Sequence, residues 1–547
     1  MKITCKGIAT ACAVLILTSC MKKTTVDAIY FNAKIYTVNS SFSIAEAMAV
    51  SSGKIIEVGS EKELLAKYST EKKIDLEGKF VYPGFIDAHC HFFGYGQTLA
   101  QVNLVGMKSW ETCLEKVRMW VSKHPDGWIT GRGWDQNDWE SQLYPTKEKL
   151  DELFPERPVY LTRIDGHACI VNQAALDLAG INENTRIAGS EIISADGKLT
   201  GVLIDNAKDS IEILIPQMTE QQIANALLEV QQDCFSVGLT TVSDAGWTEQ
   251  VVDVIDVMQR LNETGELKMR IYAMLTDHDF NREKYFQSGP IKTDRLNVRA
   301  FKFYADGALG SRGALLLEQY SDSANWKGLQ LRPTAYYEEQ AQLCLQHGFQ
   351  MCSHAIGDSA NRLMLNIYAG ALKTKNDLRW RIEHVQVMNE NDFHLFGDYS
   401  IIPSIQSTHA TSDMYWAEER LGPLRIKSAY AYKQLMLQNN MIANGTDFPV
   451  EYINPLFSFY AAIARKDQKG FPEEGFQTKD SLSREEALKA MTIWAAYANF
   501  EENEKGSLEK DKFADFVVLE KDIMTIPFEE TFITKVLMTY VGGERVY

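Results

Sequence analysis

The sequence predicts an α/β protein whose main body is a (β/α)₈ TIM-like barrel. Eight apolar segments typical of strands follow one another along the middle of the chain. Amphipathic helices fit several of the gaps between them, and this alternation is the pattern of a barrel. The predicted strands are 84–91, 240–245, 269–275, 298–304, 350–354, 380–384, 401–405 and 441–447, and the predicted helices include 220–237, 250–264 and 336–347.

Composition excludes several other classes of protein. The 547 residues are 45% hydrophobic and 24% charged, which is typical of a soluble globular chain and excludes a collagen, a coiled-coil rod, a disordered tail or a polytopic membrane protein. Asp and Glu number 73 against 56 Lys and Arg, giving a net charge of −17. A field of this sign repels phosphate backbones, so we expect no nucleic-acid partner.

The first 20 residues are expected to be a lipoprotein signal peptide rather than part of the fold. Lys2 and Lys6 precede an apolar run at 8–17, which is too short for a bilayer span of about 20 residues. The tetrad at 17–20 resembles a bacterial lipobox in which Cys20 is lipidated, the alternative being an ordinary signal peptide cut nearby. We expect an exported bacterial lipoprotein, periplasm-facing or outer-membrane anchored, that meets the membrane through its lipid alone.

Both ends of the remaining chain are rich in strand-like segments. These segments are 28–36, 47–58, 513–519 and 535–547. We expect residues 21–83 and 500–547 to form one composite β-sandwich domain beside a barrel domain of residues 84–499.

A long insert separates the first two predicted barrel strands. Residues 92–216 are too many for a structureless loop, so we expect an inserted lid domain. Five of the ten tryptophans lie in it: Trp110, Trp120, Trp128, Trp134 and Trp139. They indicate either the insert's own core or an apolar wall facing a ligand.

The first barrel strand carries a His-Cys-His triplet. Because side chains alternate along a strand, His89 and His91 share a face while Cys90 points away and is rejected as a ligand. Two imidazoles on one face can chelate a divalent metal, although such a pair can equally be a satisfied polar site.

Three further candidates each end a later predicted strand. They are His354, His384 and Asp447. The carboxyl ends of barrel strands form the face where barrel active sites lie. Three or four N and O ligands with room for water describe an open catalytic metal site.

Lys302 lies inside a predicted strand between aromatic residues. One interpretation is a lysine that extends its ammonium to solvent. An unpaired ammonium inside the barrel would be unfavourable, whereas a lysine carboxylated by CO₂ is an anionic oxygen ligand that can bridge two metals.

Together these motifs resemble the amidohydrolase superfamily. Pro-Gly-Phe-Ile-Asp-Ala-His-Cys-His at 83–91, the segment 302–312, His-Ala-Ile-Gly-Asp at 354–358 and Arg-Ile-Glu-His at 381–384 are similar to its family 3 branch, the N-substituted formamide deformylase-like group. The resemblance covers most of the chain after residue 20. It implies six metal-centre residues: His89 and His91 for one ion, His354 and His384 for another, carboxylated Lys302 as the bridge and Asp447 beside the nucleophilic water.

The resemblance and the candidate metal-centre residues together imply a mechanism. One or two divalent ions, expected to be zinc, lower the pKa of bound water to about 7. Asp447 acts as the general base and returns the proton to the leaving nitrogen. We expect a metal-dependent hydrolase acting on carbon–nitrogen bonds other than peptide bonds, with a small-molecule substrate. The alternatives are ester, lactone or cyclic-ureide hydrolysis on the same centre, and a ligand-binding lipoprotein without catalysis.

Substrate contacts are the remaining candidates. They are His409 after the seventh strand, Arg312, and Trp134, Asp135 and His167 of the insert. A structural role stays open for each of them. A homodimer is the expected oligomer because symmetric dimers are the commonest assembly.

Overall fold

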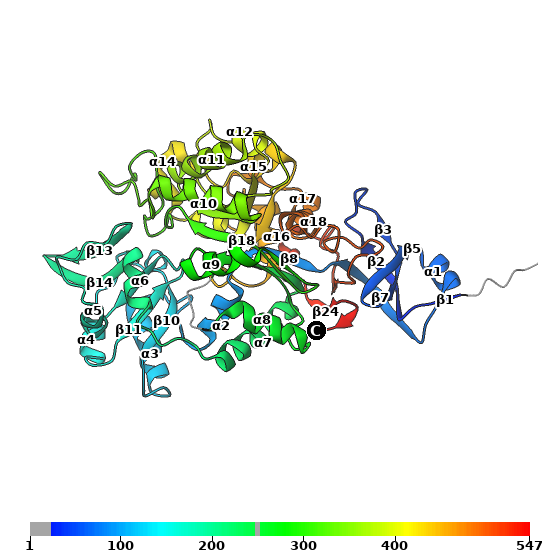
Figure 1. Ribbon diagram of the computed structural model, residues 1–547, viewed down its shortest axis with the longest axis horizontal. Helices are drawn as coiled ribbons and strands as arrows, with labels where there is room; N and C mark the ends of the chain where they lie inside the picture. The colour runs from blue at the N-terminus through cyan, green and yellow to red at the C-terminus, as the bar shows by residue number, and fades with distance from the viewer. Residues whose placement is uncertain (1–22, 247–251) are drawn as a thin grey trace, which may run out of the picture.

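A computed structural model describes residues 23–246 and 252–547 of the chain. Figure 1 shows the barrel in the centre, the insert on one side and a β-sheet from both chain ends on the other. Cys20 lies outside the described residues, so the lipid anchor stays a prediction. Gln250, where one predicted helix begins, also lies outside them. Within the described ranges, no helix combines the length and apolarity needed to cross a membrane.

Eight parallel strands form a nearly closed barrel, and the predicted fold class is confirmed. They are β8 (Phe85–Cys90), β15 (Leu239–Asp244), β16 (Arg270–Thr276), β18 (Leu296–Tyr304), β19 (Gln350–Ala355), β20 (Arg381–His384), β21 (Ile402–Gln406) and β22 (Ala443–Gly445). They neighbour one another in chain order, and the short β17 (Ile291–Lys292) pairs antiparallel with β18. Their bounds differ from the predicted ones by no more than two residues.

The seam between β22 and β8 brings the two ends of the barrel together. Gly445 is required there, because a Cβ atom on it would lie 2.4 Å from the backbone nitrogen of His89. Beyond this close approach, the Asp447 N–H donates to the His89 carbonyl at 2.8 Å, and the His91 N–H donates to the Phe448 carbonyl at 2.8 Å. The seam therefore places Asp447 beside the histidine pair.

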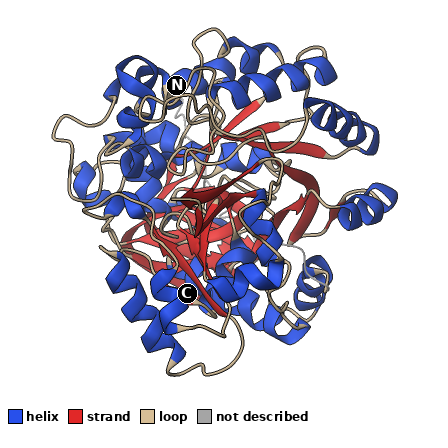
Figure 2. Ribbon diagram, turned by 90° about the vertical axis from the view of Figure 1, so that its left-hand side faces the viewer, coloured by secondary structure: helices blue, strands red, loops and turns tan. Residues whose placement is uncertain are grey.

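Helices surround the strands on the outside, as Figure 2 shows. The barrel helices are α2 (Phe92–Leu99), α7 (Glu220–Ser236), α8 (Val254–Glu263), α9 (Asp279–Ser288), α10 (Thr334–His347), α11 (Asp358–Leu372), α12 (His394–Asp398), α13 (Ser407–Asp413), α14 (Ala417–Arg425), α15 (Tyr432–Asn439), α16 (Pro455–Ala464), α17 (Arg484–Ala490) and α18 (Ile493–Ala498). Helix α7 begins with a capping box, in which the Thr219 side chain accepts from the Gln222 N–H.

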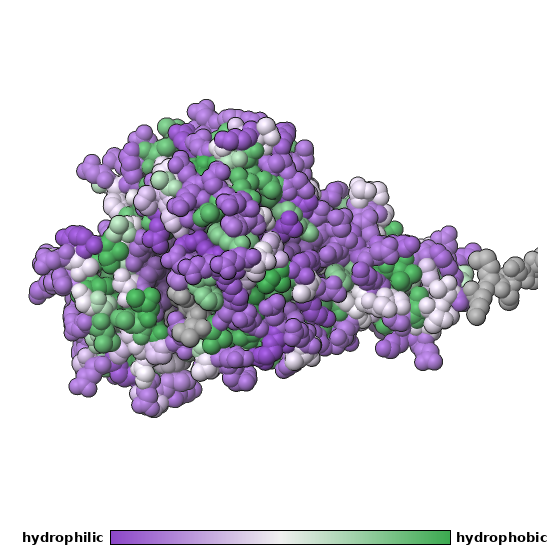
Figure 3. All heavy atoms as spheres, viewed as in Figure 1, coloured by the Kyte–Doolittle hydropathy of each residue, from purple (hydrophilic) through white to green (hydrophobic). Residues whose placement is uncertain are grey.

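The face of the molecule shown in Figure 3 is largely hydrophilic, as the charged composition predicts.

The insert contains a six-stranded sheet of its own. In spatial order its strands are β13 (Ser190–Ala195), β14 (Lys198–Asp205), β12 (Ala168–Val171), β11 (Val159–Arg163), β10 (Ile129–Trp134) and β9 (Val102–Asn103). Its helices are α3 (Trp110–Val121), α4 (Glu148–Leu153), α5 (Gln173–Ala179) and α6 (Asn206–Glu212). All five tryptophans belong to or pack against its two apolar clusters. This favours the interpretation that they build the insert's core.

The two ends of the chain meet in one eight-stranded sheet. Its strands are β2 (Ala28–Tyr36), β3 (Ile44–Ala45), β4 (Ala47–Ser51), β5 (Lys54–Gly59), β7 (Lys72–Pro83), β23 (Phe516–Leu519), β24 (Val536–Val541) and β25 (Glu544–Arg545). Helices α1 (Glu61–Lys67) and α19 (Phe528–Thr531) and the short pair β1 (Thr24–Thr25) and β6 (Tyr68–Ser69) complete the terminal segments. Because β7 pairs with both β2 and β23, residues from both ends share one apolar cluster. The division of the chain into a terminal β-domain, a barrel domain and an inserted domain stays a prediction.

A buried ion pair joins the barrel to this terminal sheet. The guanidinium of Arg270 on β16 donates to both carboxylate oxygens of Asp515, at 2.6 and 3.0 Å. Asp515 also accepts from the Gly542 N–H at 2.7 Å. Both charged side chains are buried, so removing one partner would leave the other uncompensated.

We expect Asp515→Asn to lower the free energy of unfolding by about 3 kcal/mol, because it leaves the buried Arg270 charge unpaired. Urea unfolding followed by circular dichroism measures the change. The control is Glu152→Gln, which breaks an exposed pair with Lys149 on α4 and should leave stability unchanged. Equal effects of the two substitutions would contradict the structural role of the buried pair.

Candidate metal centre

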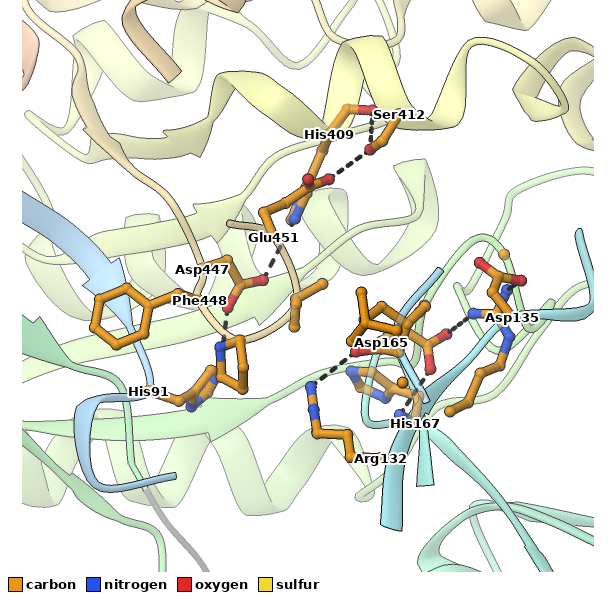
Figure 4. A pocket seen from close by; sticks show the side chains of 18 of the residues that line it. His91, Arg132, Asp135, Asp165, His167, His409, Ser412, Asp447, Phe448 and Glu451 are labelled. Atoms are coloured by element: carbon orange, nitrogen blue, oxygen red, sulfur yellow. Dashed lines mark hydrogen bonds and ion pairs between the residues drawn. The ribbon is translucent and has the colours of Figure 1, made fainter. Parts of the chain in front are cut away.

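A cavity of about 680 Å³ lies between the carboxyl ends of the barrel strands and the insert. This volume is in the range of small-molecule sites, roughly 300–1,000 Å³. Its barrel side includes His91, Lys302, His354, His384, His409 and Asp447, and its insert side includes Arg132, Asp135, Asp165 and His167. Figure 4 shows that side chains from both parts enter the same space.

Ligand-type side chains from different strands converge on the floor of this cavity. His89 on β8, His384 at the end of β20 and Asp447 after β22 place ligand atoms within 4.8 Å of one another. Asp447 Oδ1 lies 3.2 Å from His91 Nε2 and 3.6 Å from His89 Nε2. His354 on β19 joins them, with its ring centroid 4.6 Å from that of His384. The structure thus brings these five predicted ligands together.

Strand alternation separates Cys90 from this cluster. Its Sγ atom lies 3.6 Å from the Ser243 carbonyl oxygen on β15, and the side chain is fully buried. Burial raises the pKa of the Cys90 thiol well above its ordinary value, which opposes the thiolate form that binds metal.

Glu383 fixes the orientation of His89. His89 Nδ1 lies 2.7 Å from Glu383 Oε2, and the Arg381 guanidinium donates to the other carboxylate oxygen at 2.7 Å. All three side chains are fully buried. Burial alone would raise the pKa of Glu383, but Arg381 and His89 hold it well below its usual range. The carboxylate therefore engages Nδ1–H and leaves His89 Nε2 free to bind a metal.

Sequence reasoning did not identify Glu383 as a site residue. The signal was present, because Arg381 and Glu383 are two residues apart on a strand and share a face.

Polar partners also orient His384 and His354, through different ring nitrogens. His384 Nδ1 lies 2.7 Å from the Gln406 side-chain oxygen. His354 Nε2 lies 3.4 Å from the Gly307 carbonyl and 3.5 Å from Asp306 Oδ1, which leaves Nδ1 as the available nitrogen.

The backbone at two of the converging residues is unusual. His384 and Asp447 have φ values of 75° and 63°. Such left-handed backbone is uncommon outside glycine and gathers at functional sites.

Burial keeps the central imidazoles neutral. Desolvation, followed by the charge of Lys302, lowers the pKa of His89 to about 4. Burial and neighbouring histidines lower the pKa values of His354 and His384 well below the ordinary value. Neutral imidazole is the form that coordinates metal ions.

Lys302 does not reach solvent. Its side chain is fully buried, and Nζ lies 3.4 Å from His89 Nε2. Burial lowers the pKa of this amine to about 8. Because the side chain is fully buried, the interpretation as a lysine extending to solvent is wrong.

Asp447 and His409 contribute two buried atoms without hydrogen bonds inside the described part of the chain. They are Asp447 Oδ1 and His409 Nε2. His409 Nε2 lies 3.5 Å from Asp447 Oδ2, while His409 Nδ1 contacts the Gln386 side-chain amide at 2.9 Å. Burial would raise the pKa of Asp447, yet the facing His91 and His89 rings hold it well below its usual range. An ionised carboxylate with an orphaned oxygen among neutral imidazoles fits a divalent cation.

Three of the predicted substrate-contact residues line the cavity: Asp135, His167 and His409. Asp135 forms an ion pair with Arg163 of the insert. His167 Nδ1 lies 2.7 Å from Asp205 Oδ1, and its ring centroid is 4.9 Å from that of His354. With His409 they surround the space above the metal ligands; contact with a substrate stays a prediction.

The structure corrects the other two substrate candidates. Trp134 is fully buried in the insert, where its Nε1–H donates to the Leu161 carbonyl at 2.7 Å. Arg312 forms an ion pair with Asp322 at 2.8 Å. Neither side chain lines the cavity, because Trp134 packs inside the insert and Arg312 pairs with Asp322.

In a comparison with known protein families, residues 72–547 match the model of the "Amidohydrolase family". The chain is 32% identical to "Protein LONG AFTER FAR-RED 3" of Arabidopsis thaliana, with 95% of this chain and 91% of that protein covered. It is 25% identical to "N-substituted formamide deformylase" of Arthrobacter pascens, over 95% and 98% of the two chains. A solved "uncharacterized metal-dependent hydrolase" from Pyrococcus furiosus matches with a TM-score of 0.71 and 27% identity, over 91% and 100%.

We expect Glu383→Gln to weaken zinc binding by about 10- to 100-fold, since the amide holds His89 less firmly and lowers its basicity. Competition with a chromophoric chelator measures the affinity. Glu390→Gln, an exposed change on the loop after β20, is the matched control and should bind zinc as the wild type does. Wild-type affinity in both variants would show that Glu383 does not support the metal.

Proposed function

Because the chain belongs to the amidohydrolase family, it is a metal-dependent hydrolase, and we propose that it cleaves an amide-type carbon–nitrogen bond of a small molecule. The observation that carries this proposal is the ionised Asp447 at the cavity floor, whose buried Oδ1 makes no hydrogen bond and which lies beside the neutral imidazoles of His89 and His384. The resemblance to a relative named for deformylation of N-substituted formamides supports the choice of bond.

We assign the metal ligands as follows. His89 and His91 would hold one ion, His354 and His384 a second, with carboxylated Lys302 between them and Asp447 beside the first. The close approach of Lys302 Nζ to His89 Nε2, 3.4 Å, supports this arrangement. When bound, zinc or a similar ion would act as a Lewis acid that lowers the pKa of a water molecule and polarises the scissile carbonyl.

Asp447 carries the proton in this proposal. Its pKa lies well below neutrality, so the carboxylate is ionised and accepts a proton from the attacking water. It then delivers the proton to the leaving nitrogen, which an amide requires because an amide anion is a poor leaving group. His409, whose Nε2 lies 3.5 Å from Asp447 Oδ2, would donate to the developing oxyanion of the carbonyl.

Lys302 is suited to carboxylation. A buried amine with a pKa near 8 keeps a neutral fraction at physiological pH. The neutral amine adds CO₂ to form a carbamate and releases one proton, which turns an unpaired buried cation into an anionic oxygen ligand.

Removal of the metal should abolish hydrolysis. We expect the purified protein to carry at least about one equivalent of zinc or a similar ion, because the donor set fits such an ion. Elemental analysis measures the content, and dialysis against a chelator followed by zinc addition should remove and restore amide hydrolysis. Less than about half an equivalent, with activity that resists the chelator, would contradict the proposal.

Asp447→Asn should retain metal yet lose turnover by about 10²- to 10⁴-fold, because the amide cannot take the proton from water. Metal content and kcat on one amide substrate are measured together. Asp398→Asn on α12, an exposed change, is the control and should keep both. Unchanged activity in Asp447→Asn would mean that another group is the base.

Incubation with ¹³C-bicarbonate should give a carbamate carbon signal in the NMR spectrum of the wild-type protein. Lys302→Met cannot form the carbamate and should lack this signal. A spectrum identical in the two proteins would contradict carboxylation of Lys302.

A further inference from the structure

Arg132 is a cation of the cavity that the proposed mechanism does not use. It lies on β10 of the insert and lines the cavity that the metal ligands share. Its Nη2 donates to the Ile164 carbonyl at 2.8 Å. Within the described ranges this is the guanidinium's single hydrogen bond, and the buried Nε–H has no partner. The buried Nε–H is therefore left unsatisfied, and no hydrogen bond to the described residues is made by Nη1.

The neighbouring carboxylates do not compensate Arg132. Asp135 and Asp165 both form ion pairs with Arg163, and Asp165 also accepts from the His167 N–H. No carboxylate of the described residues lies within ion-pair distance of Arg132. Burial lowers the pKa of Arg132, and Asp165 and Asp447 offset this only in part. A half-buried guanidinium without an anion is unfavourable unless a ligand supplies one.

The chain keeps space open beside this guanidinium. Gly166 has a φ of 77°, and a Cβ atom on it would lie 3.2 Å from Arg132 Nη1. Figure 4 shows the Arg132 side chain extending from the insert into the cavity that His91 and Asp447 enter from the barrel. An anion bound here would lie in the same cavity as the metal ligands.

We propose that Arg132 binds a carboxylate group of the substrate, so that the natural substrates are acidic amides such as N-acylated amino acids. This inference rests on the proposed function. A guanidinium matches the planar, two-oxygen geometry of a carboxylate. A carboxylate has one negative charge, so the acidic residues that also line the cavity (Asp135, Asp165 and Glu451) repel it less than they would a phosphate dianion. Arg132 would anchor the acidic end while the scissile amide lies over the metal centre.

Two probes that differ by one carboxylate test the proposal. They are N-benzoylglycine and N-methylbenzamide, titrated by calorimetry into the zinc-loaded wild type, Arg132→Met and Arg132→Lys. We expect the wild type to bind N-benzoylglycine at least about 10-fold more tightly than N-methylbenzamide. Arg132→Met should lose this preference, and Arg132→Lys should keep part of it.

Arg312→Met is the matched control, because Arg312 pairs with Asp322 outside the cavity; it should keep the wild-type preference. Absence of the preference in the wild type, including no binding of either probe, overturns the proposal. So does a preference that survives in Arg132→Met, which would place the carboxylate on the metal instead.

Hydrolysis is measured separately by release of glycine or methylamine from the same probes. A carboxylate preference that depends on Arg132, without release of amine, would count against the proposed amide hydrolysis and not against the binding role. Hydrolysis of both probes without a preference would overturn the role of Arg132 and leave the proposed function standing.

Discussion

The carboxylate of Glu383 is the group on which the geometry of the metal centre depends. It is fully buried and satisfied on both sides, by Arg381 and by His89. Arg381 in turn donates to the Ala88 carbonyl at 2.8 Å, so the ion pair ties β20 to β8 inside the barrel. A buried ion pair is tolerated when its hydrogen bonds are complete. Here that completeness also fixes which nitrogen of His89 faces the cavity.

The barrel, and the convergence of the candidate ligand residues at one end of it, can be predicted from the sequence because both follow local rules. Apolar strand segments can be recognised one at a time, and residues at the carboxyl ends of parallel strands must lie on one face. The spacing of Arg381 and Glu383 indicates a charge pair on one strand face, but not its contact with His89, which is distant in the chain. Gln406 and Asp205 orient His384 and His167 by contacts that no local sequence pattern indicates.

The error at Trp134 has a local cause. Arg132 and Trp134 are two residues apart, and regular alternation would put both on one face of β10. The register shifts between them, and Gly133 between them has a φ of 110°. A bulge of this kind re-aims side chains. Arg132 therefore lines the cavity while Trp134 enters the insert's core.

In the proposed site, the electric charge of the centre would link carboxylation of Lys302 to metal binding. Glu383 is balanced by Arg381, and the central histidines are neutral. Lys302 and Asp447 bring opposite charges to the floor, an ammonium and a carboxylate. Carboxylation would reverse the sign of Lys302 and leave two negative charges in a buried site. Divalent cations would neutralise them, and because binding is reciprocal, each event would favour the other. In the proposed site, the carbamate and the metal would therefore depend on each other.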